Sequence, residues 1–261
     1  MTNREEQRKG RETAVNAQAA LREKAVTVTG LSKSYSGKKV IENLNLTIRT
    51  GQIYGLLGAN GAGKSTAVEC ILGTRRADSG EVRILGLDPV TERRHLFEQV
   101  GVQFQEASYP DRIKVRELCE ETACLYEKTA DYRDLLRQFK LEDKADSMLS
   151  QLSGGQKQRL FIILALIPGP RVVFLDELTT GLDTKSRREV WKCLLEMKDK
   201  GLSICLVSHF MDEVEMLCDQ IGILRNGMFV FEGTVKEAVD NSPYSNLEDA
   251  YLWWTQEEEN R

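Results

Sequence analysis

The first part of the chain alternates polar and apolar residues in the manner of strands. Residues 26–29 are alternately valine and threonine, a β-branched run that favours a strand. Over residues 44–48 an apolar side chain recurs at every second position, as in a half-buried strand. The polar residues 36–39 lie between these segments and are typical of a turn. The sequence therefore predicts antiparallel β structure here.

Farther along, short apolar runs alternate with segments of helical periodicity. The runs at residues 53–57, 172–175 and 204–207 have the length and apolar content of buried strands. Residues 66–72 and 185–200 carry apolar side chains at helical spacing, and each segment is followed by a glycine. Apolar strands that alternate with helices predict an α/β fold with a mostly parallel sheet covered on both faces.

Further elements follow from local signals. Residues 111–149 are mostly amphipathic and helical, and the long apolar helix after them is expected to end at Pro168. Asn226-Gly227 indicates a hairpin, and a capping box at residues 234–237 begins a last helix. We expect a charged flexible or frayed helical extension (1–24), a main domain (25–240) with a helical subdomain at about 105–170, and a C-terminal helical tail (241–261).

Composition and charge exclude several classes of protein. With 41% hydrophobic and 29% charged residues among 261, the chain can bury a core and is not compositionally disordered. The formal net charge of -4 argues against binding to a nucleic-acid backbone. The longest apolar run, residues 160–167, is far shorter than the ~20 residues that a membrane-spanning helix needs. The charged N-terminus does not resemble a secretory signal, and the 6 cysteines form no Cys-x-x-Cys pair. We expect a soluble cytoplasmic protein.

A phosphate-binding motif follows the apolar run at residues 53–57. The motif is a P-loop, a glycine followed by four residues and then Gly-Lys-Ser: Gly58, Ala59, Asn60, Gly61, Ala62, Gly63, Lys64 and Ser65. Backbone amides of such a turn and of the helix that follows converge on phosphate oxygens. Lys64 is expected to reach the β- and γ-phosphates, and the Ser65 hydroxyl is expected to ligate Mg²⁺.

A pair of carboxylates ends another apolar strand segment. Asp176 and Glu177 come directly after residues 172–175, and ligands in open α/β sheets lie beyond the carboxyl ends of strands. Asp176 is expected to hold Mg²⁺ directly or through water, and Glu177 to polarise an attacking water. Alone, this pair is more often a strand end that leads into a solvated loop. The P-loop makes the functional interpretation the better one.

A second candidate anion-binding turn stands before the long apolar helix. Residues 152–156 read Leu-Ser-Gly-Gly-Gln, so the Ser153 hydroxyl, the amides of Gly154 and Gly155 and a helix N-terminus come together. An ordinary N-cap is the alternative interpretation, and it would be preferred if the segment stood alone.

The P-loop, the Leu-Ser-Gly-Gly-Gln segment and the Asp-Glu pair, in this order, resemble the ATP-binding-cassette (ABC) ATPases over residues 25–240. Residues 178–183 and 247–252 more narrowly resemble nucleotide-binding subunits of bacterial ABC-2-type exporters. The resemblance implies a P-loop NTPase fold with a mostly parallel sheet core, an antiparallel β subdomain and an α-helical subdomain.

The resemblance also implies roles for four further residues. Tyr35 matches the aromatic residue that stacks on adenine, although it is alternatively a surface tyrosine. Gln105 matches the glutamine that contacts Mg²⁺ and faces the membrane subunit, with Gln103 as a rival two residues away. Asp183 matches the aspartate that follows the catalytic carboxylate, and it is also a good N-cap. His209 matches the histidine that contacts the γ-phosphate, whereas a lone histidine is usually structural.

On this basis we expect the following site. The catalytic residues are Glu177, His209 and Lys64; ATP is bound by Tyr35, residues 58–65, Thr66, Ser153, Gly154, Gly155, Gln156 and Asp183; and Mg²⁺ is held by Ser65, Gln105 and Asp176.

Two features depart from the pattern of the family, and one is the segment Pro168-Gly169-Pro170, which makes the approach to the Asp-Glu strand unusually rigid. The residue after Asp176 and Glu177 is usually proline, and here it is Leu178. The change removes neither a ligand nor the candidate base. It puts in doubt the geometry of the loop around Glu177.

The expected function is ATP hydrolysis that drives a transporter, and the same resemblance implies an exporter. Two cassettes face each other head to tail in this family, as a homodimer or heterodimer, and each ATP lies between one P-loop and the partner's serine-glycine turn. A separately encoded transmembrane permease would dock near residues 105–150 and hold the cassette at the inner face of the membrane. The alternatives are a soluble cassette ATPase of the cofactor-assembly type and a subunit that binds ATP only for regulation.

Overall fold

The computed structural model describes residues 24–104 and 109–256. Its strands are β1 (Lys24–Tyr35), β2 (Lys38–Arg49), β3 (Ile53–Gly58), β4 (Ser79–Ile84), β5 (Val100–Gln103), β6 (Val172–Asp176), β7 (Ser203–Val207), β8 (Gln220–Arg225) and β9 (Met228–Gly233). Its helices are α2 (Lys64–Ile71), α3 (Arg93–Phe97), α4 (Val115–Ala123), α5 (Tyr132–Gln138), α6 (Gly154–Leu166), α7 (Thr184–Asp199), α8 (Met211–Leu217), α9 (Val235–Asp240) and α10 (Leu247–Thr255), with 3-10 turns η1 (Glu142–Lys144) and η2 (Leu149–Gln151). The extension expected at residues 1–24 lies almost wholly outside the described residues.

The start of the described chain forms an antiparallel sheet in the order β2-β1-β4. Val26 of β1 pairs with Ile48 of β2 and with Ile84 of β4. Ser36 and Gly37 make the turn between β1 and β2, both with positive φ. The antiparallel β structure predicted for this region is confirmed, and β4 is a strand that none of the patterns used above predicts.

The second sheet has the strand order β5-β6-β7-β3-β8-β9 in the described part of the chain. Every neighbouring pair is parallel except β8 and β9, which are joined by the hairpin turn at Asn226 and Gly227. The mostly parallel sheet that the apolar runs predicted is therefore confirmed. Because β3 and β6 both end at one edge of the sheet, the loops that follow them meet there.

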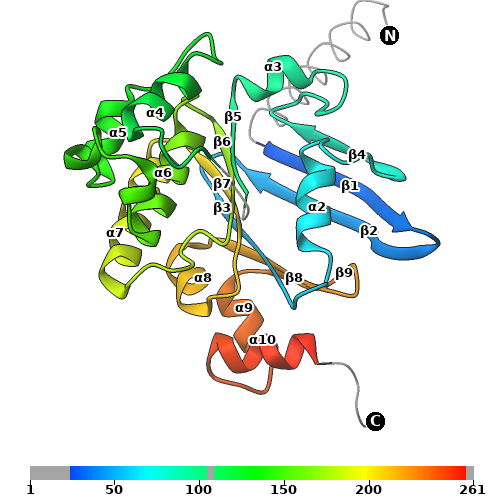
Figure 1. The fold of residues 1–261 in the computed structure, drawn as a ribbon. Helices are drawn as coiled ribbons and strands as arrows, with labels where there is room; N and C mark the ends of the chain where they lie inside the picture. The colour runs from blue at the N-terminus through cyan, green and yellow to red at the C-terminus, as the bar shows by residue number, and fades with distance from the viewer. Residues whose placement is uncertain (1–23, 105–108, 257–261) are drawn as a thin grey trace, which may run out of the picture.

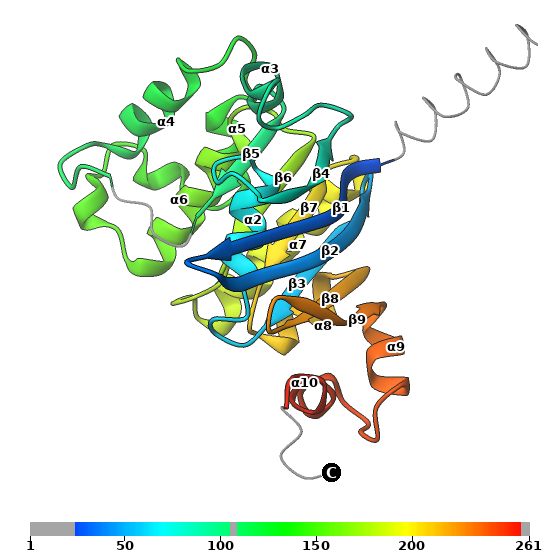
Figure 2. The same ribbon diagram turned by 90° about the vertical axis from the view of Figure 1, so that its right-hand side faces the viewer.

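Helix α2 lies between the two sheets, and longer helices cover the opposite face of the parallel sheet (Figures 1 and 2). Strand β6 shows this two-sided burial residue by residue. Phe174 packs with the α2 side, whereas Val173 and Leu175 pack with the side of α4, α5, α6 and α7. A strand buried on both faces needs an apolar run, which explains why its sequence does not alternate.

Strand β5 approaches helix α6 very closely at Gly101. A Cβ atom at this position would lie 1.9 Å from the carbonyl oxygen of Ala165 in α6, so only glycine fits. Helix α6 ends at Leu166, two residues before Pro168, as the sequence predicted. Strand β5 is thus in direct contact with α6 at Gly101.

The C-terminal segment packs on the edge of the parallel sheet. Leu247 and Ala250 of α10 are fully buried with residues of β8, β9 and α9. Trp254 packs on Phe231 at 5.1 Å between ring centroids, and its indole N–H donates to the carbonyl of Ala238 at 3.0 Å. The expected helical tail is therefore part of the packed structure. No helix within residues 24–104 and 109–256 is both long enough and apolar enough to cross a bilayer.

Candidate functional site

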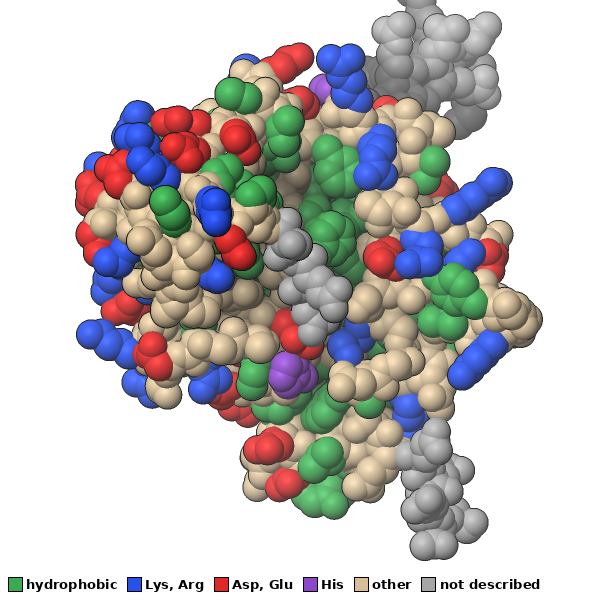
Figure 3. All heavy atoms as spheres, in the orientation of Figure 1, with side chains coloured by type: hydrophobic (Ala, Val, Ile, Leu, Met, Phe, Trp, Pro, Cys, Tyr) green, Lys and Arg blue, Asp and Glu red, His purple; other side chains and the backbone are tan. Residues whose placement is uncertain are grey.

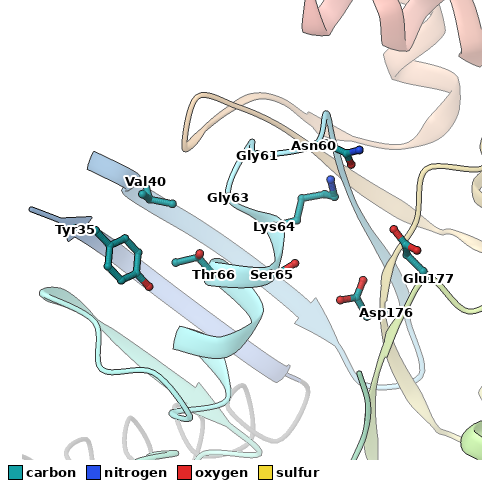
Figure 4. Close-up of a pocket in the computed structure, with 10 residues that line it drawn as sticks. All are labelled: Tyr35, Val40, Asn60, Gly61, Gly63, Lys64, Ser65, Thr66, Asp176 and Glu177. Carbon is teal, nitrogen blue, oxygen red and sulfur yellow. The ribbon is translucent and has the colours of Figure 1, made fainter. Parts of the chain in front are cut away.

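A cavity of about 520 Å³ lies at the carboxyl ends of β3 and β6, next to the N-terminus of α2. Figure 4 shows the Tyr35 ring on one side of the α2 N-terminus and both carboxylates with Ser65 on the other. Its lining residues are Tyr35, Val40, Asn60, Gly61, Gly63, Lys64, Ser65, Thr66, Asp176 and Glu177. Residues from opposite ends of the sequence, predicted separately, thus meet in one cavity.

The loop before α2 bends through backbone conformations that favour glycine. Gly61 and Gly63 have φ of 81° and 107°, in the left-handed region. A Cβ at Gly63 would lie 2.7 Å from both Ile41 Cδ1 and the Val40 carbonyl oxygen. Gly63 is also the N-cap of α2, and no side chain caps this helix. The amides of the first turn are therefore presented to the cavity, which suits an anion.

Lys64 begins α2 and turns back over the loop. Its ammonium group donates to the carbonyl oxygens of Gly58 at 2.7 Å and Ala59 at 3.0 Å. Burial lowers its pKa, and the negative charges of Asp176 and Glu177 partly oppose that shift. The Lys64 ammonium group is thus partly desolvated. Partial desolvation strengthens its electrostatic attraction for an added phosphate.

Asp176 and Glu177 end β6 and begin the loop toward α7. Burial, with the Glu177 charge as a second cause, raises the pKa of Asp176 to about 6, and Lys64 opposes this shift. The Glu177 N–H donates to the Val207 carbonyl at 2.9 Å, which ties this loop to the end of β7. Glu177 has a φ of 50°, an uncommon left-handed conformation for a non-glycine residue.

Leu178 is the position at which the sequence departs from the family pattern next to the two carboxylates. Its side chain is fully buried in the core on the α6 and α7 side of the sheet. Both carboxylates before it nevertheless line the cavity. With leucine at this position, Asp176 and Glu177 both border the cavity that Lys64 and Ser65 line.

His209 lies beside Glu177 at the end of the neighbouring strand β7. Its Nδ1 atom is 3.6 Å from Glu177 Oε1, and its side chain is 48% exposed. The ring packs on Phe210 with 4.1 Å between centroids. His209 is not itself a lining residue of the cavity, and it stands at the cavity's Glu177 side.

Tyr35 is the last residue of β1 and forms the far wall of the cavity. Its side chain is 38% exposed, and two cations face the ring: Lys33 Nζ at 5.3 Å and Arg75 Cζ at 5.4 Å from the centroid. The ring is thus accessible for stacking and is held in place by cation–π contacts.

The donor atoms fit a magnesium nucleotide. Within residues 24–104 and 109–256, no cluster of three or more His, Cys, Asp or Glu side chains could hold a metal alone. Ser65 and Asp176 both line the cavity and supply a hydroxyl and a carboxylate, the oxygen ligands that Mg²⁺ prefers. Such a sparse set suits an ion that also binds substrate phosphates. A cation there would also relieve the crowding of negative charge that raises the pKa of Asp176.

The Leu-Ser-Gly-Gly-Gln segment lies outside this cavity. Ser153 caps α6 in a capping box: its hydroxyl accepts from the Gln156 N–H at 3.3 Å, and Gln156 Oε1 accepts from the Ser153 N–H at 2.9 Å. Open space surrounds the Cα of Gly154, whereas a Cβ at Gly155 would approach Leu182 at 2.9 Å. A single chain therefore does not bring Ser153 to the lining of the cavity around Lys64.

Asp183 is an N-cap, as its alternative interpretation proposed. Its carboxylate accepts from the Ser186 N–H at 2.9 Å and from the Ser186 hydroxyl at 2.7 Å. These hydrogen bonds lower the pKa of Asp183. Asp183 lies outside the lining of the cavity around Lys64. Its role as the aspartate of the family motif therefore stays a prediction.

Of the two rival glutamines, the structure describes one. Gln105 lies outside the described residues. Gln103 ends β5 with a buried side chain whose amide donates to the Phe104 carbonyl at 2.9 Å. Gln103 lines a second cavity beside Phe104 and not the one around Lys64.

Comparison with known proteins agrees with this geometry. A sequence model described as "ABC transporter" matches residues 41–180. The chain belongs to the ABC transporter family. Its members are ATPases, so the chain is an ATP-binding ABC cassette.

Individual proteins support the family assignment. The Nod factor export ATP-binding protein I of Rhizobium meliloti (strain 1021) is 39% identical over 222 residues, which are 83% of this chain and 66% of that protein. The chain thus spans about two thirds of that relative's length. A solved ATP-binding subunit of an ABC transporter superimposes with a TM-score of 0.81 at 26% identity, covering 89% of this chain and 100% of that one. MJ0796, a bacterial ABC transporter cassette solved as a dimer, shares the fold (TM-score 0.71, 24% identity, 80% of this chain and 98% of that one).

The cassette also holds polar residues that the sequence did not single out. Gln158 of α6 donates to the Glu177 carbonyl at 3.3 Å, and Thr180 lies 3.5 Å from Glu177 Oε2. Ser208 is buried beside His209 and donates to Glu213 at 2.6 Å. Gln158 and Ser208 belong to no motif used above, and Thr180 lies in the segment 178–183 without having been given a role of its own.

Proposed function

We propose that this ABC cassette is the ATP-hydrolysing, energy-coupling subunit of an exporter, acting as a head-to-tail dimer on a separate permease. The observation that carries the proposal is the convergence of Lys64, Ser65, Asp176 and Glu177 on one cavity. The export role is supported by the printed function of the Rhizobium relative, a Nod factor export ATP-binding protein.

ATP fits the cavity in one orientation. Tyr35 offers an accessible ring to the base at one end, and the amides after Gly63 with Lys64 suit the phosphates at the other. Ser65 and Asp176 would hold Mg²⁺ against the terminal phosphates. When bound, this ion neutralises charge that develops on the phosphoryl group.

Glu177 is the proposed base, and it acts by orienting water. Its left-handed backbone holds the carboxylate at the cavity edge, close to His209. Lys64 stabilises negative charge on the phosphates, and His209 is proposed to contact the γ-phosphate from the Glu177 side. Catalysis in this class is mostly positioning and charge stabilisation, so residues that fix these side chains matter as much as the base.

The position of the second anion-binding turn supports the proposed dimer. Ser153 and Gly154 begin α6 outside the cavity that Lys64 lines. A second copy in head-to-tail orientation would bring its α6 N-terminus to the γ-phosphate side of this cavity. ATP then binds the closed dimer more tightly than the open one, and hydrolysis removes that difference. The dimeric cassette with the same fold is consistent with this arrangement.

The permease is proposed to dock at a second cavity on the helical side. This cavity of about 390 Å³ is lined mostly by apolar residues, including Phe104, Tyr109, Tyr126 and Phe161. Leu125 stands at its edge with 75% of its surface exposed. Figure 3 shows hydrophobic side chains gathered in the hollow between the helical part and the antiparallel sheet. Exposed apolar surface of this kind is typical of a protein interface.

The variant Glu177→Gln tests the proposal. We expect it to keep ATP binding, to lose nearly all turnover and to accumulate a closed dimer, measured by ATPase assay and size-exclusion chromatography with Mg²⁺ and ATP. Adding membranes that contain the permease should stimulate the wild-type protein and not the variant. Turnover of Glu177→Gln at the wild-type rate would refute Glu177 as the base. A wild-type protein that binds ATP without turnover, with or without membranes, would favour a regulatory subunit instead.

A further inference from the structure

A glutamate is buried behind the catalytic loops without a role in the mechanism described so far. Glu213, in α8, is 0% exposed. Burying a carboxylate is unfavourable unless hydrogen bonds compensate, and an apolar side chain would pack here at lower cost. Its neighbours Val214 and Leu217 already anchor α8 in the core. The acid therefore needs an explanation other than packing.

The Glu213 carboxylate joins α8 to two other segments. Its Oε2 accepts from the Ser208 hydroxyl at 2.6 Å, and its Oε1 accepts from the Trp191 indole N–H of α7 at 3.2 Å. Both partners are buried, Ser208 at 1% and Trp191 at 6% exposure. Hydrogen bonds of this kind, shielded from water, fix geometry more firmly than exposed ones.

The contact with Ser208 sets the turn that carries His209. The Ser208 hydroxyl donates to Glu213 and at the same time accepts from the Phe210 N–H at 3.1 Å. The Ser208 hydroxyl thus connects the backbone of Phe210 to the Glu213 carboxylate through two hydrogen bonds. The His209 ring in this turn is exposed, and its Nδ1 atom lies 3.6 Å from Glu177 Oε1.

The same carboxylate faces the loop that carries Glu177. Thr179, two residues after Glu177, is 1% exposed. Its hydroxyl lies near enough to Glu213 to lower the pKa of that carboxyl, against the larger effect of burial. It does not complete a hydrogen bond of normal geometry within the described residues. The hydrogen bond that Glu213 makes is thus to the turn that carries His209.

We propose that Glu213 is a positioning residue that sets the separation of His209 from Glu177 by anchoring the turn that carries His209 from behind. The proposal rests on the proposed ATPase function of this site. The two hydrogen-bond partners of the Glu213 carboxylate named above, Ser208 and Trp191, do not line the nucleotide cavity. Removing the carboxylate should therefore lower turnover and leave nucleotide affinity nearly unchanged.

Two variants test the anchor from its two sides. Glu213→Gln keeps the size of the side chain but replaces one acceptor oxygen by an NH₂ group. That group cannot accept from the Ser208 hydroxyl or the Trp191 indole N–H. Ser208→Ala removes the hydroxyl and keeps the glutamate. We expect each to lower kcat about 10-fold or more, with KM for ATP within about twofold of wild type, because small misplacements of catalytic groups strongly reduce rates. The double variant should lose little more than either single one, because both break the same link.

The matched control is Val214→Ala. Val214 is the next residue of α8, equally buried, and makes no polar side-chain contact. Its truncation should lower the melting temperature and leave kcat unchanged, which separates loss of stability from loss of positioning.

The outcomes are distinct. Wild-type kcat in folded Glu213→Gln and Ser208→Ala, or a rise in KM that accounts for the whole loss, would leave Glu213 a structural residue and refute the inference. If Glu213→Gln does not fold, Ser208→Ala decides alone. A wild-type cassette without turnover would refute the proposed function and this inference together.

Discussion

Replacing Asp176 by asparagine should stabilise the nucleotide-free cassette at neutral pH while it impairs Mg²⁺-dependent ATP binding. The structure raises the pKa of Asp176 from an ordinary 3.8 to about 6, first because of burial and then because of Glu177. This difference corresponds to about 3 kcal/mol of destabilisation when the carboxylate is charged. The side chain is only partly buried, so solvent screening reduces the expected effect to about 1–2 kcal/mol.

The pH dependence of this effect has a definite sign. The folded protein binds the Asp176 proton more tightly than the unfolded chain does, so ionisation of this group destabilises the fold as pH rises from about 4 to about 6. The gain from Asp176→Asn should accordingly be largest at pH 7 and above and shrink toward pH 4. The loss of a negative charge and of a metal ligand should meanwhile weaken binding of Mg-ATP.

The assay is urea denaturation of wild type and Asp176→Asn in parallel at several pH values, without nucleotide, followed by Mg-ATP titration. Saturating Mg-ATP should stabilise the wild type more than the variant. A variant that is less stable than wild type at pH 7, or a difference that does not change between pH 4 and pH 7, would refute the reasoning. Such a result would mean that the attraction of Lys64 outweighs burial and the repulsion from Glu177.

Two further variants probe the rest of the cavity. Tyr35→Ala should weaken ATP binding by about 1–3 kcal/mol through lost stacking, whereas Tyr35→Phe should bind nearly as wild type in an equilibrium titration with a fluorescent ATP analogue. Equal weakening in both would contradict stacking. Gly63→Ala should destabilise the fold by more than about 1 kcal/mol, because its φ is positive and its Cβ would meet Ile41 and the Val40 carbonyl. Gly61→Ala, where the same φ region opens on free space, should lose less in thermal denaturation, and the reverse order would refute the packing argument.

Strong local signals explain why much of this site could be predicted from the sequence. The strand that ends at Asp176 is buried on both faces, so its apolar run has no other simple interpretation. The P-loop glycines are needed for a backbone that only glycine adopts easily, which is why the motif is specific. These are places where local chemistry and tertiary structure require the same residues.

Other features had no such signal. Strand β4 begins with exposed Ser79 and Gly80 and so shows no strand pattern, and β5 has only four residues. Helix α8 has only 7 residues, and the hydrogen-bond partners of Glu213 within it, Ser208 and Trp191, are brought together by folding. The sequence separated the roles of Gln103 and Gln105 only by resemblance. The left-handed backbone of Glu177 likewise depends on the loop around it and not on the residue type.

The close contact of Gly101 with Ala165 has a mechanical consequence. Helix α6 is 13 residues long, about 20 Å from end to end. Phe161, Leu164 and Ala165 in its second half form a wall of the apolar cavity on the helical side, and Ser153 caps its other end. Helix α6 packs tightly against β5 near Ala165. This contact would therefore be the pivot if the helix tilted. A tilt of the helix about this contact would therefore move the Ser153 turn, at its far end, more than the residues beside Ala165.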